Sequence, residues 1–140
     1  MSETAEHLSF VQVLVKYIQD CHAPCDGITI LTDTAGAPTD GKPHRIGGFV
    51  PDVYAVNIPT TFCIIGEAKV ESDLETEHSR LQLEAFLQHL SLSGSGTLIL
   101  AVPWQVSVAA RRILLNAAAK INATNVEKLV LDSMGNGARC

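Results

Sequence analysis

Two carboxylates and a lysine occur at a spacing that could form a metal-binding site. Asp52 follows a proline in one strand-like run, and Glu67 and Lys69 follow a second run with the apolar stretch 62–65. Residues two apart on a strand project from the same face, so Glu67 and Lys69 point the same way. If the runs pair as a hairpin around a turn at 57–59, Asp52 reaches the same end of the sheet.

The chemistry of such a cluster follows from its charges. Carboxylates held close together repel each other, and a divalent cation bound between them relieves that repulsion. Oxygen ligands of this kind suit Mg²⁺ or Mn²⁺. A simpler interpretation is that these are surface charges on an ordinary hairpin. The apolar run that precedes Glu67 argues against it, because a buried strand that ends in charge indicates a shared task for those charges.

The motif Pro51-Asp52 followed by Glu67-Ala68-Lys69 resembles the signature of the PD-(D/E)XK nuclease superfamily. The resemblance implies a restriction-endonuclease-like fold and metal-dependent hydrolysis of nucleic-acid phosphodiesters by Mg²⁺ or Mn²⁺, with DNA as the habitual substrate. It implies that Asp52, Glu67 and the Ala68 carbonyl hold the metal. Lys69 would then position or deprotonate the attacking water, or neutralise charge that develops on the phosphate.

A glutamate near the N-terminus is a further candidate for the same site. Apolar residues at helical spacing predict a helix over 4–20, and Glu6 lies four residues before Phe10, on or beside its apolar stripe. In the superfamily the first helix often brings a glutamate towards the metal, and Glu6 is the best match. The alternative is a first-turn glutamate that only stabilises the helix dipole.

A glutamine in the next predicted helix, 76–91, is the last candidate. The stretch from Gln82 to Phe86 resembles the Gln-hydrophobic-X-X-Tyr motif of the RecB-like branch, with phenylalanine in place of tyrosine. The resemblance implies that Gln82 helps to orient the catalytic site. A solvated helix glutamine is the alternative interpretation.

The order of the predicted elements indicates an α/β fold. It is helix, three strands, helix, strand, helix, strand (αβββαβαβ), which favours a sandwich in which helices flank a mixed sheet. The superfamily core has the first six of these elements, so the resemblance covers about residues 4 to 102. The helices are expected over 4–20, 76–91 and 105–121, and the strands over 27–32, on both sides of 57–59, and over 97–102 and 126–131.

Composition limits the class of protein. The chain has 140 residues, 46% hydrophobic and 18% charged, which predicts one globular domain over 1–140, with 133–140 as a flexible tail. The apolar runs are too short to cross a bilayer, and the acidic N-terminus is unlike a signal peptide. We therefore expect a cytoplasmic protein with no membrane partner, in which Cys21, Cys25, Cys63 and Cys140 are reduced thiols.

The net charge of −5 is unfavourable for a protein that binds phosphates. It leaves two further hypotheses open. The chain can be a catalytically silent nuclease-fold module that binds a protein partner or DNA, or an active subunit whose basic surface comes from a homodimer mate or a larger complex. The cations expected near the site or on facing helices are Lys42, His44, Arg45, Lys69, Arg80, Arg111 and Arg112.

Overall fold

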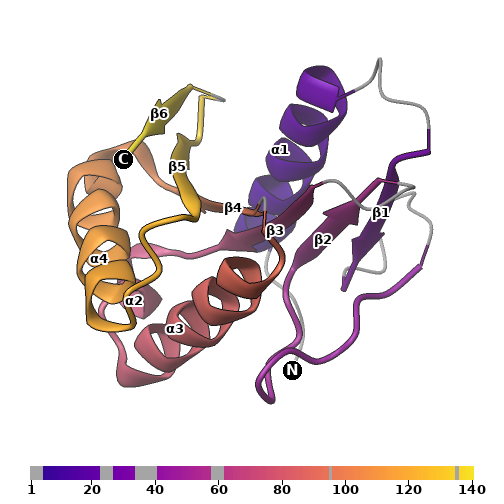
Figure 1. The fold of residues 1–140 in the computed structure, drawn as a ribbon. Helices are drawn as coiled ribbons and strands as arrows, with labels where there is room; N and C mark the ends of the chain where they lie inside the picture. The colour runs from indigo at the N-terminus through magenta and orange to yellow at the C-terminus, as the bar shows by residue number, and fades with distance from the viewer. Residues whose placement is uncertain (1–4, 23–26, 34–40, 58–61, 95, 135) are drawn as a thin grey trace.

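The computed structural model describes residues 5–22, 27–33, 41–57, 62–94, 96–134 and 136–140. Its described strands form one mixed sheet in which six strands lie in chain order (Figure 1). Strand β2 is antiparallel to both of its neighbours, β1 and β3. Strands β3, β4 and β5 are parallel, and β6 is antiparallel to β5. The strands are β1 (Thr29–Thr32), β2 (Val53–Val56), β3 (Cys63–Ala68), β4 (Gly96–Val102), β5 (Glu127–Asp132) and β6 (Gly137–Arg139).

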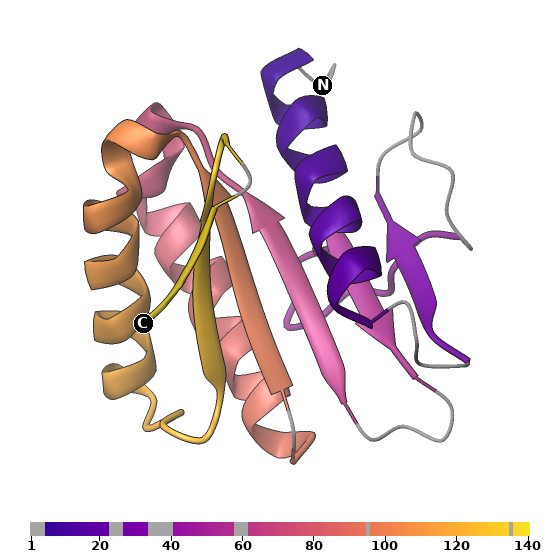
Figure 2. The ribbon, with the colours of Figure 1, turned by 90° about the horizontal axis from the view of Figure 1, so that it is seen from above.

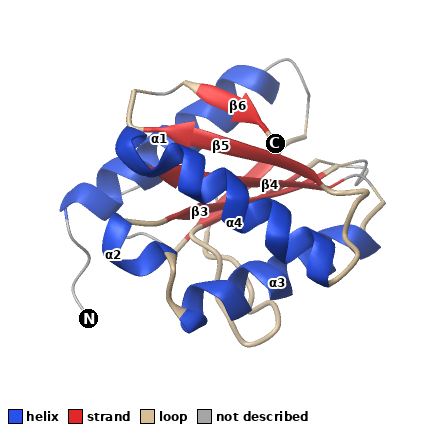
Figure 3. Cartoon of the chain, turned by 90° about the vertical axis from the view of Figure 1, so that its left-hand side faces the viewer, coloured by secondary structure: helices blue, strands red, loops and turns tan. Residues whose placement is uncertain are grey.

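Helices cover both faces of this sheet. Helix α1 packs on one face, and α3 and α4 pack on the other (Figures 1 and 2). In the side view of Figure 3, α3 and α4 lie across the near side of the sheet. The helical segments are α1 (Ala5–His22), α2 (Glu71–Leu74), α3 (Glu77–Leu92), the 3₁₀ turn η1 (Trp104–Val106) and α4 (Ser107–Lys120).

Strand β4 shows why the chain forms these layers. Its residues alternate between two apolar clusters: Leu98 and Leu100 pack with α3 and α4, whereas Ile99 packs with α1. A continuous apolar run is the pattern of a strand that is covered on both faces. The predicted α/β class, with a mixed sheet flanked by helices, is therefore confirmed.

The hairpin that carries the candidate site has a defined register. Strands β2 and β3 pair from Val53 opposite Gly66 to Val56 opposite Cys63. The register therefore brings Asp52, which precedes β2, level with Glu67 in β3. The predicted turn at 57–59 lies partly outside the described residues.

The C-terminal segment differs from the flexible tail expected over 133–140. Asp132 Oδ1 accepts hydrogen bonds from the amides of Met134 (2.9 Å) and Asn136 (3.1 Å). This side-chain-stabilised turn reverses the chain, and β6 then pairs with β5. The short helix α2, the turn η1 and strand β6 are all additions to the predicted order. Hydrophobic periodicity does not show such short segments, because local hydrogen bonds define them.

The hydrophobicity of the helices gives one further finding. Among the described helices, none is both long enough and apolar enough to cross a membrane.

Candidate active site

Four polar side chains, three from the ends of two strands and one from a helix, are nearly buried together at the end of β3. Asp52 is 9% exposed, Glu67 2%, Lys69 8% and Gln82 7%. Charged side chains are seldom buried to this extent unless they are paired. Their burial excludes the interpretation that the carboxylates and the lysine are ordinary surface charges of a hairpin.

Asp52 is held by groups from two different elements. The backbone N–H of Ala68 donates a hydrogen bond of 2.8 Å to Asp52 Oδ2. His7 Nε2, from the first turns of α1, lies 3.2 Å from the same oxygen. Burial by itself raises the pKa of Asp52, but the hydrogen bonds from His7, Glu67 and the Ala68 amide outweigh it, so the pKa lies below 3.8. The surroundings of Asp52 therefore favour its ionised form.

Glu67 is in the opposite electrostatic situation. Burial raises its pKa well above 4.5, and the negative charge of neighbouring Asp52 raises it further, while Lys69 acts in the other direction. Two carboxyl groups this close resist simultaneous ionisation. The pair therefore favours a state in which Glu67 keeps a proton that it shares with Asp52. Glu67 Oε2 is buried and has no hydrogen-bond partner among the described residues.

Lys69 is fixed by a residue distant in sequence. Its Nζ donates a hydrogen bond to Oε1 of Gln82, in the middle of α3. The backbone N–H of Lys69 donates to Ala101 O at 2.9 Å, which ties this position to β4. The structure thus brings together four of the five residues proposed as catalytic: Asp52, Glu67, Lys69 and Gln82.

The fifth, Glu6, is exposed on α1, and it is the next residue, His7, that reaches Asp52. The sequence contained a signal for this. His7 is spaced three, four and seven residues before Phe10, Val11 and Leu14, all of which are buried. It therefore lies on the buried stripe of the helix, whereas Glu6 lies beside it.

The phenylalanine at the aromatic position of the RecB-like motif belongs to the hydrophobic core. Phe86 is fully buried in the core between α3 and the sheet. Its ring meets that of Phe49 edge to face, at 6.4 Å between centroids. A tyrosine hydroxyl at this depth would need a hydrogen-bond partner, which a phenylalanine does not.

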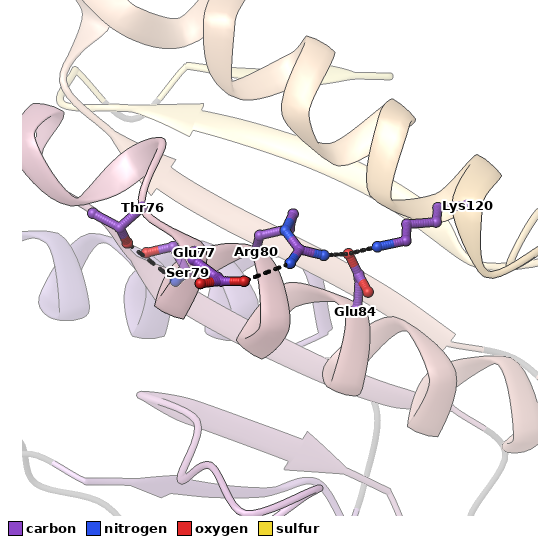
Figure 4. Close-up of polar contacts among 6 residues, drawn as sticks. All are labelled: Thr76, Glu77, Ser79, Arg80, Glu84 and Lys120. Carbon is purple, nitrogen blue, oxygen red and sulfur yellow. Dashed lines mark hydrogen bonds and ion pairs between the residues drawn. The ribbon is translucent and has the colours of Figure 1, made fainter.

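A cavity of about 430 Å³ lies between α3 and α4, and none of the four site residues lines it. Figure 4 shows the charges beside it. Arg80 pairs with Glu77 at 3.2 Å and with Glu84 at 3.0 Å, and Lys120 lies 3.5 Å from Glu84. Thr76 caps α3 by accepting the Ser79 amide. Arg80, expected among the cations available for phosphate, is therefore already neutralised within its own helix.

Possible metal ligands are few in this site. Over the ranges that the structure describes, no group of three or more histidine, cysteine, aspartate or glutamate side chains is arranged to hold a metal ion. Any cation here would depend on the two carboxylates, with main-chain oxygen such as that of Ala68. Cys21, Cys63 and Cys140 are free thiols, and Cys25 lies outside the described residues.

Comparison with known proteins adds little to this geometry. No protein-family model matches the sequence, and no curated protein matches it. Among solved structures, the chain is similar to that of Pyrococcus furiosus SfsA in complex with Ca²⁺, with 12% identity and a TM-score of 0.45. The match covers 88% of this chain and 57% of the SfsA chain, so this chain spans little more than half of that protein. A similarity of this size says nothing about the site.

Proposed function

We propose that the chain is a metal-dependent nuclease of the PD-(D/E)XK type, with a restriction-endonuclease-like fold, that hydrolyses phosphodiester bonds in DNA. The observation that carries this proposal is Oε2 of Glu67, which is buried beside Asp52 and Lys69 and has no hydrogen-bond partner in the described part of the chain. Leaving a buried polar oxygen without a partner is costly. Buried charge pairs with strongly shifted pKa values are typical of functional sites.

The donor atoms fit the cation that the resemblance implies. Asp52 and Glu67 provide carboxylate oxygens, and Ala68 provides a backbone carbonyl at the end of β3. Hard oxygen ligands of this kind suit Mg²⁺ or Mn²⁺. Bound there, the cation would supply a nucleophilic water at neutral pH and Lewis-acid stabilisation of the phosphate.

The protein's own groups have separate tasks in this proposal. The His7 ring and the Ala68 amide hold the Asp52 carboxylate in one orientation. Gln82 accepts one of the three N–H donors of Lys69, which leaves the ammonium able to donate to a water or a phosphate oxygen. Lys69 then positions or deprotonates the attacking water, or offsets the charge that develops on the phosphate.

The direct test is cleavage of plasmid, single-stranded and branched DNA with Mg²⁺, Mn²⁺ or EDTA. We expect cleavage only with metal, and its loss in Asp52→Asn and Glu67→Gln. Glu71→Gln removes the same charge from an exposed position in α2 and should cleave like the parent. Metal should also raise the melting temperature of the parent by mass action, and less so that of the two site variants.

A second candidate function is supported by the net charge of −5 and by the lack of a three-ligand group among the described residues. In that case the chain is a catalytically silent module that binds DNA or a protein partner. It would show no cleavage and no thermal shift with any of the metals. DNA binding that weakens steeply with salt would then identify the nucleic acid as its partner, whereas absent binding would favour a protein.

A further inference from the structure

A second cavity, of about 330 Å³, lies between α3 and the segment that precedes β2. It is lined by His44, Arg45, Ile46, Gly47, Tyr54 and His89. These described lining residues include two histidines, an arginine and a tyrosine, and no carboxylate. In a chain with net charge −5 this selection stands out, because the cavity beside Arg80 contains three glutamates and a third cavity contains Asp132. The lining favours an anion.

A tight turn holds one wall of this cavity, the segment before β2, in place. Ile46 and Phe49 exchange two backbone hydrogen bonds of 2.7 and 3.1 Å around Gly47 and Gly48, whose φ angles are +60° and +88°. Positive φ at both central residues is typical of a type I′ turn. Gly47 also lies so close to α3 that an added Cβ would come within 2.8 Å of Ala85 Cβ. The segment carrying His44 and Arg45 is thus fixed against the helix.

Arg45 has donors to spare. Its Nη1 donates one hydrogen bond of 3.0 Å to the Gly48 carbonyl, and guanidinium has five N–H donors in a planar fork. Within the described part of the chain, Arg45 forms no ion pair. The bond to Gly48 orients the guanidinium and leaves most of its donors for a ligand, and such a fork matches the geometry of a phosphate.

The opposite wall of the cavity is formed by a tyrosine of β2 and a histidine of α3. Tyr54 Oη lies 3.2 Å from His89 Nε2, and the rings are 5.9 Å apart between centroids. A phenol is uncharged at neutral pH, so Tyr54 adds no negative charge. The described polar side chains that line the cavity are all neutral or positive hydrogen-bonding groups.

The cavity is also close to the carboxylate pair along the sheet. Tyr54 is two residues after Asp52, a separation of about 7 Å on an extended strand. Neighbouring phosphates of one nucleic-acid strand are a comparable distance apart. We propose that this cavity binds a phosphate group of the DNA strand, next to the phosphate at the carboxylates. The inference rests on the proposed nuclease function, and it explains how an acidic chain could hold a polyanion through a local site.

Binding without metal tests the inference separately from catalysis. In EDTA, inorganic phosphate and a single-stranded oligothymidylate should shift the imidazole NMR signals of His44 and His89. Arg45→Gln should weaken oligothymidylate binding about tenfold, the loss expected for one charge-assisted hydrogen bond. Arg112, expected from the sequence among the available cations, instead pairs with Glu75 at 3.5 Å and does not line this cavity. Arg112→Gln therefore removes the same charge from α4 and should bind like the parent. His44→Gln provides a second variant if Arg45→Gln lowers the melting temperature.

The outcomes distinguish the inference from the nuclease proposal. Histidine shifts and selective weakening in Arg45→Gln, without cleavage in any metal, would support the phosphate site and overturn the nuclease. Metal-dependent cleavage with unshifted histidines and an unchanged KM in Arg45→Gln would overturn the phosphate site alone. Equal weakening by Arg45→Gln and Arg112→Gln would also overturn it, because general electrostatics would then explain the binding.

Discussion

Lys69 Nζ donates a hydrogen bond to Gln82 Oε1, which joins the end of β3 to the middle of α3. Both side chains are nearly buried, so neither can satisfy its polar atoms from bulk water. A buried ammonium without partners is strongly disfavoured. The glutamine therefore both stabilises Lys69 and holds it beside Glu67. There the positive charge of Lys69 partly opposes the rise in the pKa of Glu67.

Replacing each residue in turn should distinguish the effect of the Lys69 charge from the effect of its orientation by Gln82. Lys69→Ala removes a positive charge next to the carboxylates, so metal binding should stay intact or become tighter. Cleavage should nevertheless fall by about 10²-fold, as expected for a group that acts in proton transfer. Gln82→Ala keeps the lysine but frees it, so cleavage should fall less, by about tenfold. Calorimetric metal titration and a cleavage time course measure the two effects.

Gln88→Ala is the control for Gln82→Ala, because Gln88 is an exposed glutamine of the same helix. It should cleave like the parent. If Lys69→Ala cleaves at the parental rate while Asp52→Ala does not, the metal site stands and the role given to the lysine fails.

The raised pKa of Glu67 makes the stability of the metal-free protein depend on pH. Between 4.5 and the higher pKa of the folded state, the folded protein binds more protons than the unfolded chain. The contribution of Glu67 is therefore fully present below pH 4.5 and is lost as the pH rises through the folded-state pKa. Glu67→Gln should escape this loss, since its amide stays neutral and can still donate to Asp52.

Urea unfolding in EDTA at a series of pH values measures this effect. The advantage of Glu67→Gln should grow with pH, by about 1.4 kcal/mol for each unit by which folding raises the pKa of Glu67. A constant difference between the two proteins across the series would show that Glu67 ionises normally.

We expect substitutions of His7 and Glu6, which are neighbours in α1, to have different effects on the site. His7→Phe keeps a ring of similar size but removes the hydrogen bond to Asp52, so the pKa of Asp52 should rise. A lowered carboxylate pKa stabilises the fold above the unfolded-state pKa, and this contribution is lost as the pH falls through the folded-state value. The stability deficit of His7→Phe should therefore be present at neutral pH and shrink in acid. His7→Gln, which retains an N–H donor, should restore part of it.

Glu6→Ala is the matched test of the glutamate suggested by the superfamily resemblance. Since Glu6 is exposed, we expect little change in cleavage, and a larger loss in His7→Phe. NMR titration of the Asp52 carboxyl and cleavage assays measure both. A severe loss of cleavage in Glu6→Ala alone would instead support the glutamate as a metal-site residue.

The turn at Gly47 and Gly48, beside the cavity lined by Arg45 and His89, can be tested by two alanine substitutions. Gly48→Ala meets no atom within 4 Å, whereas Gly47→Ala would clash with Ala85. Both place a side chain at positive φ, which costs about 1–2 kcal/mol. Gly47→Ala should therefore destabilise the protein more than Gly48→Ala in urea unfolding. Adding Ala85→Gly should offset part of the excess; if it offsets none, the turn does not press on α3.

The sequence by itself determined the elements with strong apolar patterns. The stripe of α1 and the continuous run of β4 predict one helix and one doubly covered strand, because burial repeats at 3.6 residues in a helix and covers both faces of a central strand. The motif around Asp52 and Glu67 also indicated the hairpin, since paired strands bring their ends together. These features depend on residues close in sequence.

Only the tertiary structure decided which side chains complete the site. Gln82 could equally have been a solvated glutamine, and the choice between Glu6 and His7 depends on the rotation of α1 against the sheet. Strand β6 depends on an aspartate that turns the chain back to β5. The cavity proposed to bind phosphate is lined by both His44 and His89, which are far apart in sequence. Such contacts arise from packing between elements, and local propensity carries little information about them.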